Sequence, residues 1–213
     1  MRVASEFVTS AAGAAGFPKD GLPELAMVGR SNVGKSTLIN ALVRQKLART
    51  SAAPGKTRLA NFYRVAAEGR PPFFLVDLPG FGYARGGDET REAFDQLAAE
   101  YFGDRQKRNL LPFSGEPGEK KEAGSFFAGV LVLVDSRHPG LEADRRAWNW
   151  LGRLGVERHV VATKVDKLTQ AERRRHLTEL ERVYSAPVAP VSAQTGEGMD
   201  ELWKTIAKLL TRQ

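Results

Sequence analysis

Cysteine is absent from this 213-residue chain, and histidine occurs only three times, at scattered positions. The first absence excludes disulfide bonds and thiolate metal sites, and it fits a protein of the reducing cytosol. The sequence also lacks an apolar run near the roughly 18 residues that cross a bilayer, and it lacks a basic N-terminal stretch leading into an apolar core. We therefore expect a cytoplasmic protein with neither a membrane span nor a signal peptide.

Acidic residues are fewer than basic ones, with 25 Asp and Glu against 32 Lys and Arg, which gives a net charge of +7. An excess of positive charge favours polyanionic partners such as nucleic acid or anionic lipid, although solubility alone can also account for it. Aromatic residues make up 8% of the chain and rarely alternate with basic ones. Stacking on single-stranded nucleic acid is therefore not indicated, and no DNA specificity is expected.

Short runs of apolar and β-branched residues alternate along the chain with amphipathic stretches. This alternation is typical of an α/β fold in which helices cover both faces of a doubly wound, mostly parallel sheet. Six strands are predicted, at residues 25–28, 61–66, 73–77, 130–135, 159–163 and 188–191. Helices are predicted at residues 37–43, 89–101, 142–154, 170–184 and 199–210. The second and third strands flank a turn over residues 67–71 and are expected to form a hairpin.

Two stretches depart from this alternation. Residues 1–22 are a loose mixture containing Ala, Gly and Pro, and they are predicted to form an N-terminal arm whose Phe7 and Val8 pack on the edge of the domain. Residues 23–213 are then expected to form a single domain. Within it, residues 103–125 are rich in Pro, Gly, Glu and Lys and are too long for an ordinary connection. They are interpreted as a flexible surface insertion, which is either a solvated loop or an element that binds a partner.

The run GRSNVGKS at residues 29–36 fits the pattern G-x-x-x-x-G-K-[ST] of a phosphate-binding loop. A predicted strand precedes it and a predicted helix follows it, as that motif requires. Its glycines allow backbone N–H groups to close around an anion at a helix N-terminus, where the helix dipole favours negative charge. Lys35 is placed to reach the β- and γ-phosphates of a nucleotide, and the Ser36 hydroxyl to ligate magnesium. The sequence therefore predicts nucleotide binding.

Three further segments follow predicted strands, and a doubly wound sheet binds its ligands beyond such strand ends. The segment DLPG at residues 77–80 offers the Asp77 carboxylate to magnesium and the Gly80 N–H to the γ-phosphate. The segment TKVD at 163–166 offers the Asp166 carboxylate to two donors of the guanine ring, a pair that adenine lacks. The segment VSA at 191–193 offers the Ala193 N–H to the guanine carbonyl. Together these segments favour a guanine nucleotide.

Thr57 lies in the segment PGKTR at residues 54–58, within the long connection between the first helix and the second strand. A threonine there can place its hydroxyl on magnesium and its N–H near the γ-phosphate, and it loses both contacts after hydrolysis. An ordinary Pro-Gly turn is the alternative. On the first interpretation, residues 47–57 and 81–90 are the segments that move with the state of the nucleotide.

These motifs, in this order, resemble those of the EngB (YihA/YsxC) family of ribosome-biogenesis GTP-binding proteins. The resemblance runs from Phe7 onward except for the insertion, and it rests on GRSNVGKST at 29–37, PGKT at 54–57, NFY at 61–63, DLPGFGYA at 77–84, DSRH at 135–138 and TKVDK at 163–167. It implies a P-loop GTPase fold, GTP or GDP with Mg²⁺ as ligands, and an association with the large ribosomal subunit or its precursors, both rRNA and ribosomal proteins. A monomer is expected.

The resemblance also implies a link to cell division and septation, which leaves two hypotheses open. The first is a GTPase switch that acts on the assembling large ribosomal subunit. The second is a guanine-nucleotide-dependent binding module that regulates septation through a protein partner, with hydrolysis incidental.

The motifs and the resemblance together assign nucleotide contacts to five segments of the chain. Their residues are Gly29, Arg30, Ser31, Asn32, Val33, Gly34, Lys35 and Ser36; Gly55, Lys56, Thr57, Arg58 and Leu59; Asp77, Leu78, Pro79 and Gly80; Thr163, Lys164, Val165 and Asp166; and Val191, Ser192 and Ala193. Within this set, Ser36, Thr57 and Asp77 are expected to hold magnesium. Lys35, Thr57 and Gly80 are expected to take part in catalysis.

Two positions bear on the rate of hydrolysis and several on RNA binding. Ras-like GTPases carry a water-orienting glutamine after the D-x-x-G motif, but this chain has Phe81 there, so slow intrinsic hydrolysis is expected. Asn32 either helps to hold a potassium ion, as in several relatives with Asn at this point, or only supports the geometry of the loop. Some basic residues are candidates for RNA phosphate contacts, with a solvated face as the alternative: Arg105, Lys107, Arg108, Lys120, Lys121, Arg173, Arg174 and Arg175.

Overall fold

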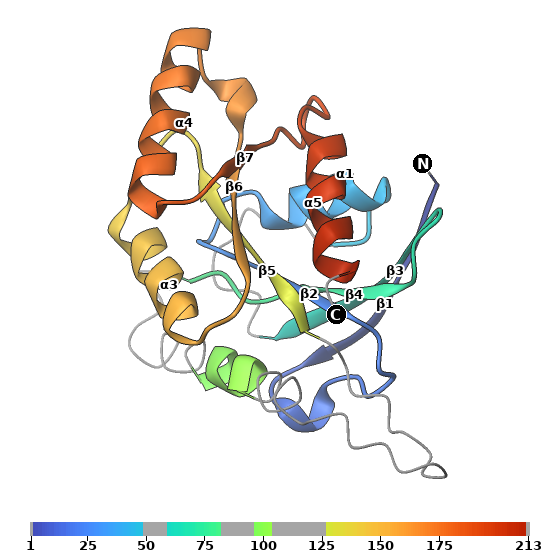
Figure 1. The fold of residues 1–213 in the computed structure, drawn as a ribbon. Helices are drawn as coiled ribbons and strands as arrows, with labels where there is room; N and C mark the ends of the chain where they lie inside the picture. Colours follow the sequence, from blue (N-terminus) through green and yellow to red (C-terminus); the bar gives the residue numbers. More distant parts are fainter. Residues whose placement is uncertain (1, 49–58, 82–95, 104–126, 212–213) are drawn as a thin grey trace.

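The structure, a computed structural model, describes residues 2–48, 59–81, 96–103 and 127–211. These described residues form one seven-stranded sheet in the order β1-β3-β4-β2-β5-β6-β7, with helices on both of its faces (Figure 1). The α/β fold with a mostly parallel, doubly wound sheet that the sequence predicts is therefore confirmed.

Among the described strands, five run parallel to one another: β4 (Phe73–Asp77), β2 (Glu24–Gly29), β5 (Phe127–Asp135), β6 (Arg158–Thr163) and β7 (Val188–Pro190). Strands β2, β4 and β5 are buried along their whole length, as expected for strands covered by helices on both faces. The register pairs Asp77 with Met27 on β2 and Asp135 with Thr163 on β6. The carboxyl ends of these strands therefore meet along one edge, which is where such sheets bind ligands.

The other two described strands are antiparallel to their neighbours. β3 (Ala60–Ala67) pairs with β4 as the predicted hairpin, and β1 (Val3–Ala11) pairs with the outer side of β3. The predicted count of six strands was therefore wrong, because β1 adds a seventh strand within the stretch interpreted as an arm. Five of the nine β1 residues are exposed and only Ala11 is buried, so the strand depends on its ladder to β3 rather than on an apolar face of its own. The Phe7 ring meets the Tyr63 ring edge-on, with centroids 5.9 Å apart.

Helices lie on both faces of the sheet. α1 (Lys35–Val43) and α5 (Met199–Thr211) cover one face, whereas α3 (Glu142–Arg153), α4 (Gln170–Tyr184) and the helical residues 96–103 cover the other (Figure 1). Two 3-10 turns, η1 (Ala14–Gly16) and η2 (Val165–Lys167), complete the described elements. α4 begins where the sequence predicts because Thr169 and Glu172 form a capping box, each side chain bonding to the backbone N–H of the other.

In the described part of the chain, buried apolar side chains form two clusters, one on each face of the sheet. Leu38 of α1 and Trp203 of α5 belong to the first, and Tyr101 and Trp148 to the second. Burial of each large apolar side chain stabilises the fold by about 1.5–3 kcal/mol relative to exposure. The clusters hold both helix layers against the sheet and so fix the strand ends relative to one another.

Some predicted features lie outside the described residues. The helix predicted at 89–101 is described from residue 96 onward, where it is helical. The insertion predicted at 103–125 is described only at Gly103, and the five basic residues between 105 and 121 are not described. Among the described helices, none has the length and apolar content that a membrane span needs.

Candidate functional site

The phosphate-binding loop turns from the end of β2 into the start of α1, as the sequence predicts. Gly34 precedes the helix with φ 104° and Asn32 adopts φ 65°, both in the left-handed region. The Val33 N–H donates to the Arg30 carbonyl at 3.1 Å, which closes the turn. A Cβ on Gly29 would lie 2.8 Å from the Val33 side chain and 3.0 Å from the Leu133 carbonyl, so this position has room only for glycine. The chain can make this turn because its glycines stand where side chains do not fit.

The D-x-x-G segment after β4 lies directly against this loop. The Ser31 N–H donates to the Phe81 carbonyl at 3.3 Å, and the Phe81 N–H donates to the Gly29 carbonyl at 3.2 Å. A Cβ on Gly80 would lie 2.9 Å from the Ser31 nitrogen, which again leaves room only for glycine. The Phe81 side chain is 9% exposed and packs in the core. The structure thus brings Gly80 next to the loop and turns the residue after it away from solvent.

Lys35 and Asp77 form a buried ion pair at the centre of the site. The Lys35 ammonium, at the first turn of α1, donates to Asp77 Oδ1, at the end of β4. Lys35 is 8% exposed and Asp77 is 3% exposed. A charge is seldom buried in a protein unless it is paired with an opposite charge. Each of these two side chains therefore offsets the charge of the other at the junction between the loop and α1. Ser36 follows Lys35 on the same turn and is half-buried.

The segment at the end of β6 is bonded to the phosphate-binding loop by two side chains. The Thr163 hydroxyl donates to the Val33 carbonyl at 2.7 Å, and the Lys164 ammonium donates to the Asn32 carbonyl at 2.6 Å. The Lys164 ammonium also donates to Asp135 Oδ2 at 2.9 Å. Lys164 itself has φ 62°, and this left-handed turn carries its side chain across to the loop. The two motifs, far apart in the sequence, form a single framework.

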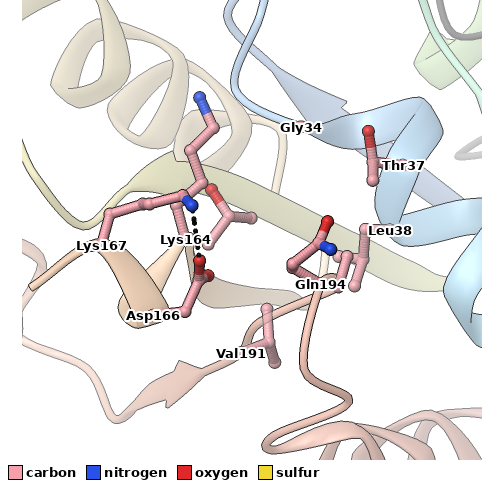
Figure 2. A pocket seen from close by; sticks show the side chains of 10 residues that line it. Gly34, Thr37, Leu38, Lys164, Asp166, Lys167, Val191 and Gln194 are labelled. Atoms are coloured by element: carbon pink, nitrogen blue, oxygen red, sulfur yellow. Dashed lines mark ion pairs between the residues drawn. The ribbon is translucent and has the colours of Figure 1, made fainter.

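Beside this framework is a pocket of about 180 Å³. Figure 2 shows Lys164, Asp166 and Lys167 on one side of it, with Thr37, Leu38 and Gln194 on the other. The Ser192 hydroxyl donates to Asp166 Oδ1 at 2.7 Å, and the Lys167 ammonium lies 3.3 Å from Asp166 Oδ2. The Ser192 hydrogen bond lowers the pKa of the Asp166 carboxyl below its usual range, with a smaller contribution from Lys167. Asp166 is therefore an ionised acceptor that borders a hollow of molecular size.

The structure brings together most of the predicted site residues that it describes. The loop over residues 29–36, the DLPG segment, the TKVD segment and the VSA segment all lie at one edge of the sheet. Leu59 is described and is 38% exposed. Gly55, Lys56, Thr57 and Arg58 lie outside the described residues. Their predicted contacts, including those of Thr57, stay predictions.

Sequence reasoning did not predict several side-chain contacts that shape this edge. Arg30 uses its Nε to donate to both carboxylate oxygens of Asp144 on α3, at 3.0 and 3.2 Å. Asp135 accepts hydrogen bonds from Arg137 and from Lys164. Asn40 of α1 holds the backbone after the helix, since its Oδ1 accepts from the N–H groups of residues 47 and 48. Their positions after strands or on helices gave a weak signal only, because spacing in sequence does not show which side chains converge.

Comparison with known proteins identifies a matching family and relatives that share one name. The family described as 50S ribosome-binding GTPase matches residues 24–164. The "Probable GTP-binding protein EngB" of Pelotomaculum thermopropionicum is 39% identical over 209 residues, which cover 96% of this chain and 94% of that protein. The protein of the same name from Oceanobacillus iheyensis is 35% identical over 213 residues, which cover 98% of this chain and 97% of that protein.

Two solved structures share the fold. The crystal structure of a probable GTP-binding protein EngB has a TM-score of 0.64 and 22% identity, covering 89% of this chain and 100% of that one. Era of Aquifex aeolicus, bound to GDP and AlF4⁻, has a TM-score of 0.70 and 23% identity, covering 90% of this chain and 58% of that one. At these identities the likeness concerns the fold.

Proposed function

This chain belongs to the EngB proteins of the 50S ribosome-binding GTPase family, and on that premise we propose that it is a GTP-binding switch that hydrolyses GTP slowly and acts in the assembly of the large ribosomal subunit. One observation carries the nucleotide part of the proposal. The phosphate-binding loop, the Lys35–Asp77 pair and the Asp166 pocket are contiguous along one edge of the sheet. Along that edge, the Lys35 ammonium would bind the phosphates of a nucleotide, and the Asp166 carboxylate, at a separate position, would bind its base.

The residues present fit a guanine nucleotide. Asp166, held by Ser192, would accept the two donors of the guanine ring, and the Ala193 N–H would meet its carbonyl. The N–H groups of the loop and Lys35 would meet the phosphates. Arg30 would contribute its backbone only, because Asp144 already engages its guanidinium.

The donor set also fits magnesium, a hard cation that prefers oxygen ligands. Ser36 and Asp77 would hold it, together with Thr57, and when bound it would neutralise charge on the β- and γ-phosphates. The buried Lys35–Asp77 pair supports this assignment, because it places a phosphate-binding cation beside a metal-binding carboxylate.

Slow hydrolysis follows from the position of Phe81. Its side chain is buried and its backbone is bonded to the loop at both ends, so it has no group that can orient a water molecule. Observations at Asn32 support both roles considered for it, as a potassium ligand and as a structural support of the loop. Its side chain is exposed, as a cation ligand would be before binding, whereas its left-handed backbone and its bond from Lys164 support a purely structural role.

Nucleotide titration tests the binding proposal. GDP and GTP with magnesium should bind far more tightly than ADP and ATP, and Lys35→Ala and Ser36→Ala should abolish magnesium-dependent binding of GTP while the chain stays folded. Arg146→Ala, which removes a charge from an exposed pair on α3, is the matched control. Equal affinity for adenine and guanine nucleotides would contradict the proposal.

Hydrolysis assays separate the two roles of Asn32. If Asn32 helps to hold potassium, replacing sodium by potassium should raise the rate, and Asn32→Ala should remove that response. A rate equal in both salts would leave Asn32 with a structural role. A fast rate in sodium alone would refute the argument from Phe81.

The ribosomal part of the proposal rests on the family, and the net charge of +7 supports it. The protein would act in the cytoplasm as a monomer. Co-sedimentation should show binding to large subunits or their precursors that depends on a non-hydrolysable GTP analogue. It should weaken as salt rises, because contacts to phosphates release counterions. Nucleotide-dependent capture of a division protein without ribosomal particles would instead favour the septation hypothesis.

A further inference from the structure

Asp135, at the end of β5, is a buried carboxylate with unusually complete hydrogen bonding. Among the described residues, its Oδ1 accepts from the Arg137 backbone N–H at 3.1 Å and from Arg137 Nε at 2.9 Å. Its Oδ2 accepts from Arg137 Nη2 at 2.8 Å and from the Lys164 ammonium at 2.9 Å. A carboxylate offers about four acceptor positions, so this one is fully used. Asp135 is 4% exposed and has little freedom to turn.

Arg137 supplies most of these bonds. Its guanidinium forms a two-point fork on the carboxylate, which fixes the plane of the carboxylate as well as its position. The Arg137 side chain is 41% exposed whereas the Asp135 side chain is buried, so the arginine covers the carboxylate from the solvent side. Burial alone would raise the pKa of Asp135, but the hydrogen bonds from Arg137 and Lys164 hold it well below its usual range. The carboxylate therefore stays charged.

The other partner of this carboxylate reaches the nucleotide site. Lys164 borders the pocket, and its ammonium is held between Asp135 Oδ2 and the Asn32 carbonyl of the phosphate-binding loop. Asp135 therefore lies in the middle of a chain of contacts, which runs from Arg137 through Asp135 and Lys164 to the phosphate-binding loop. If the carboxylate turned, the ammonium would lose one of its two acceptors.

We propose that Arg137 is a positioning residue of the nucleotide site, which orients Asp135 so that Lys164 stays bridged to the phosphate-binding loop. The inference rests on the proposed guanine-nucleotide function and deepens it. Arg137 does not line the pocket, and its hydrogen bonds go to Asp135. Its charge interacts more weakly with that of Asp166, so its main effect passes through Asp135. Arginine suits this role because a lysine, as a point charge, cannot provide the fork.

The test is GDP affinity, measured by titration of a fluorescent GDP analogue with magnesium. Arg137→Ala should weaken binding by about tenfold, equal to about 1.4 kcal/mol. Arg137→Lys should recover only part of the loss, because it restores charge without the fork. Arg146→Ala removes an arginine from an exposed pair on neighbouring α3 and should leave affinity unchanged. An Arg137→Ala protein that binds GDP as tightly as wild type would overturn the inference.

A double-mutant cycle with Asp135→Asn shows whether the effect passes through the carboxylate. Asp135→Asn alone should weaken GDP binding, and adding Arg137→Ala should cost little more. Fully additive losses would overturn the inference, because Arg137 would then act independently of Asp135. If wild type bound no guanine nucleotide, the proposed function would fail and this inference with it. If wild type bound GDP and Arg137→Ala bound it equally tightly, this inference alone would fail and the proposed function would stand.

Discussion

At the scale of single residues, the site depends on positions where no side chain fits. Gly80 lies against the backbone of Ser31, and Gly29 lies against Val33. Gly34 adopts a left-handed φ of 104° that other residues rarely tolerate. These glycines keep the D-x-x-G segment and the phosphate-binding loop in contact, so changes here should disturb the site more than the core.

Gly80→Ala should weaken GDP binding by about tenfold, because the new methyl group would meet the Ser31 nitrogen at 2.9 Å and displace the loop. That loss equals about 1.4 kcal/mol of binding free energy. Gly103→Ala is the matched control, since a Cβ there has no neighbour within 4 Å among the residues that the structure describes. Titration of both variants tests this, and equal affinities would mean that the contact does not shape the site.

Ser192→Ala should weaken GDP binding most at acidic pH. The Ser192 hydroxyl lowers the pKa of Asp166, and the guanine donors need the ionised carboxylate, so affinity falls as pH drops through that pKa. Without the hydroxyl the pKa of Asp166 rises toward the ordinary range of an aspartate. The fall should therefore begin at a higher pH in the variant.

GDP titrations between about pH 3.5 and pH 7 check this shift, because that window includes the ordinary range of an aspartate. Thr205→Ala, which removes a half-buried hydroxyl of α5 that bonds to the Glu201 carbonyl, should show the wild-type profile. Profiles of identical shape for Ser192→Ala and wild type would mean that Ser192 does not tune Asp166.

At the scale of elements, the phosphate-binding loop is tied to the helix layer by one ion pair. Arg30 leaves the loop to meet Asp144 of α3, which is 1% exposed. Burial raises the pKa of Asp144, and the Arg30 charge opposes that rise. The pair therefore links the loop to α3 at a place where an unpaired charge would be costly.

Asp144→Ala should lower the free energy of unfolding by about 1–3 kcal/mol, because it leaves the Arg30 guanidinium without its acceptor in a partly buried place. Glu142→Ala on the same helix removes an exposed carboxylate that pairs with Arg146 and should cost less, because solvent screens exposed charges. Urea unfolding of both variants measures the difference. Equal effects would show that the link between loop and helix carries no stability.

Local signals predicted some elements closely and missed another. α4 was predicted to the residue because Thr169 and Glu172 encode its start in the sequence itself. β1 was missed because its alternation of small and exposed residues resembles a loop, and only the ladder to β3 makes it a strand. In the site, motifs predicted Lys35, Asp77 and Asp166 from their spacing. The fork of Arg137 on Asp135 was not predictable, since it depends on side-chain direction after the strand ends.

At the scale of the whole molecule, the parallel register assembles one site from distant segments. Residues 29–36, 77–80, 163–166 and 191–193 each follow a different parallel strand, and the shared direction of those strands brings them to one edge (Figure 1). The loop gathers its contacts there from β4 and β6. The proposed guanine-nucleotide site would thus be a property of the sheet as a whole, and Asp166 is the residue that would give it base specificity.

Replacing Asp166 tests that central claim most directly. In Asp166→Asn, the carboxamide offers a donor to the additional carbonyl of xanthine and no longer accepts both guanine donors. Titration with GDP and XDP should therefore show GDP affinity lost and XDP affinity gained, whereas Asp200→Asn on the exposed start of α5 should leave both unchanged. A variant that binds GDP as tightly as wild type, with no gain for XDP, would contradict the account.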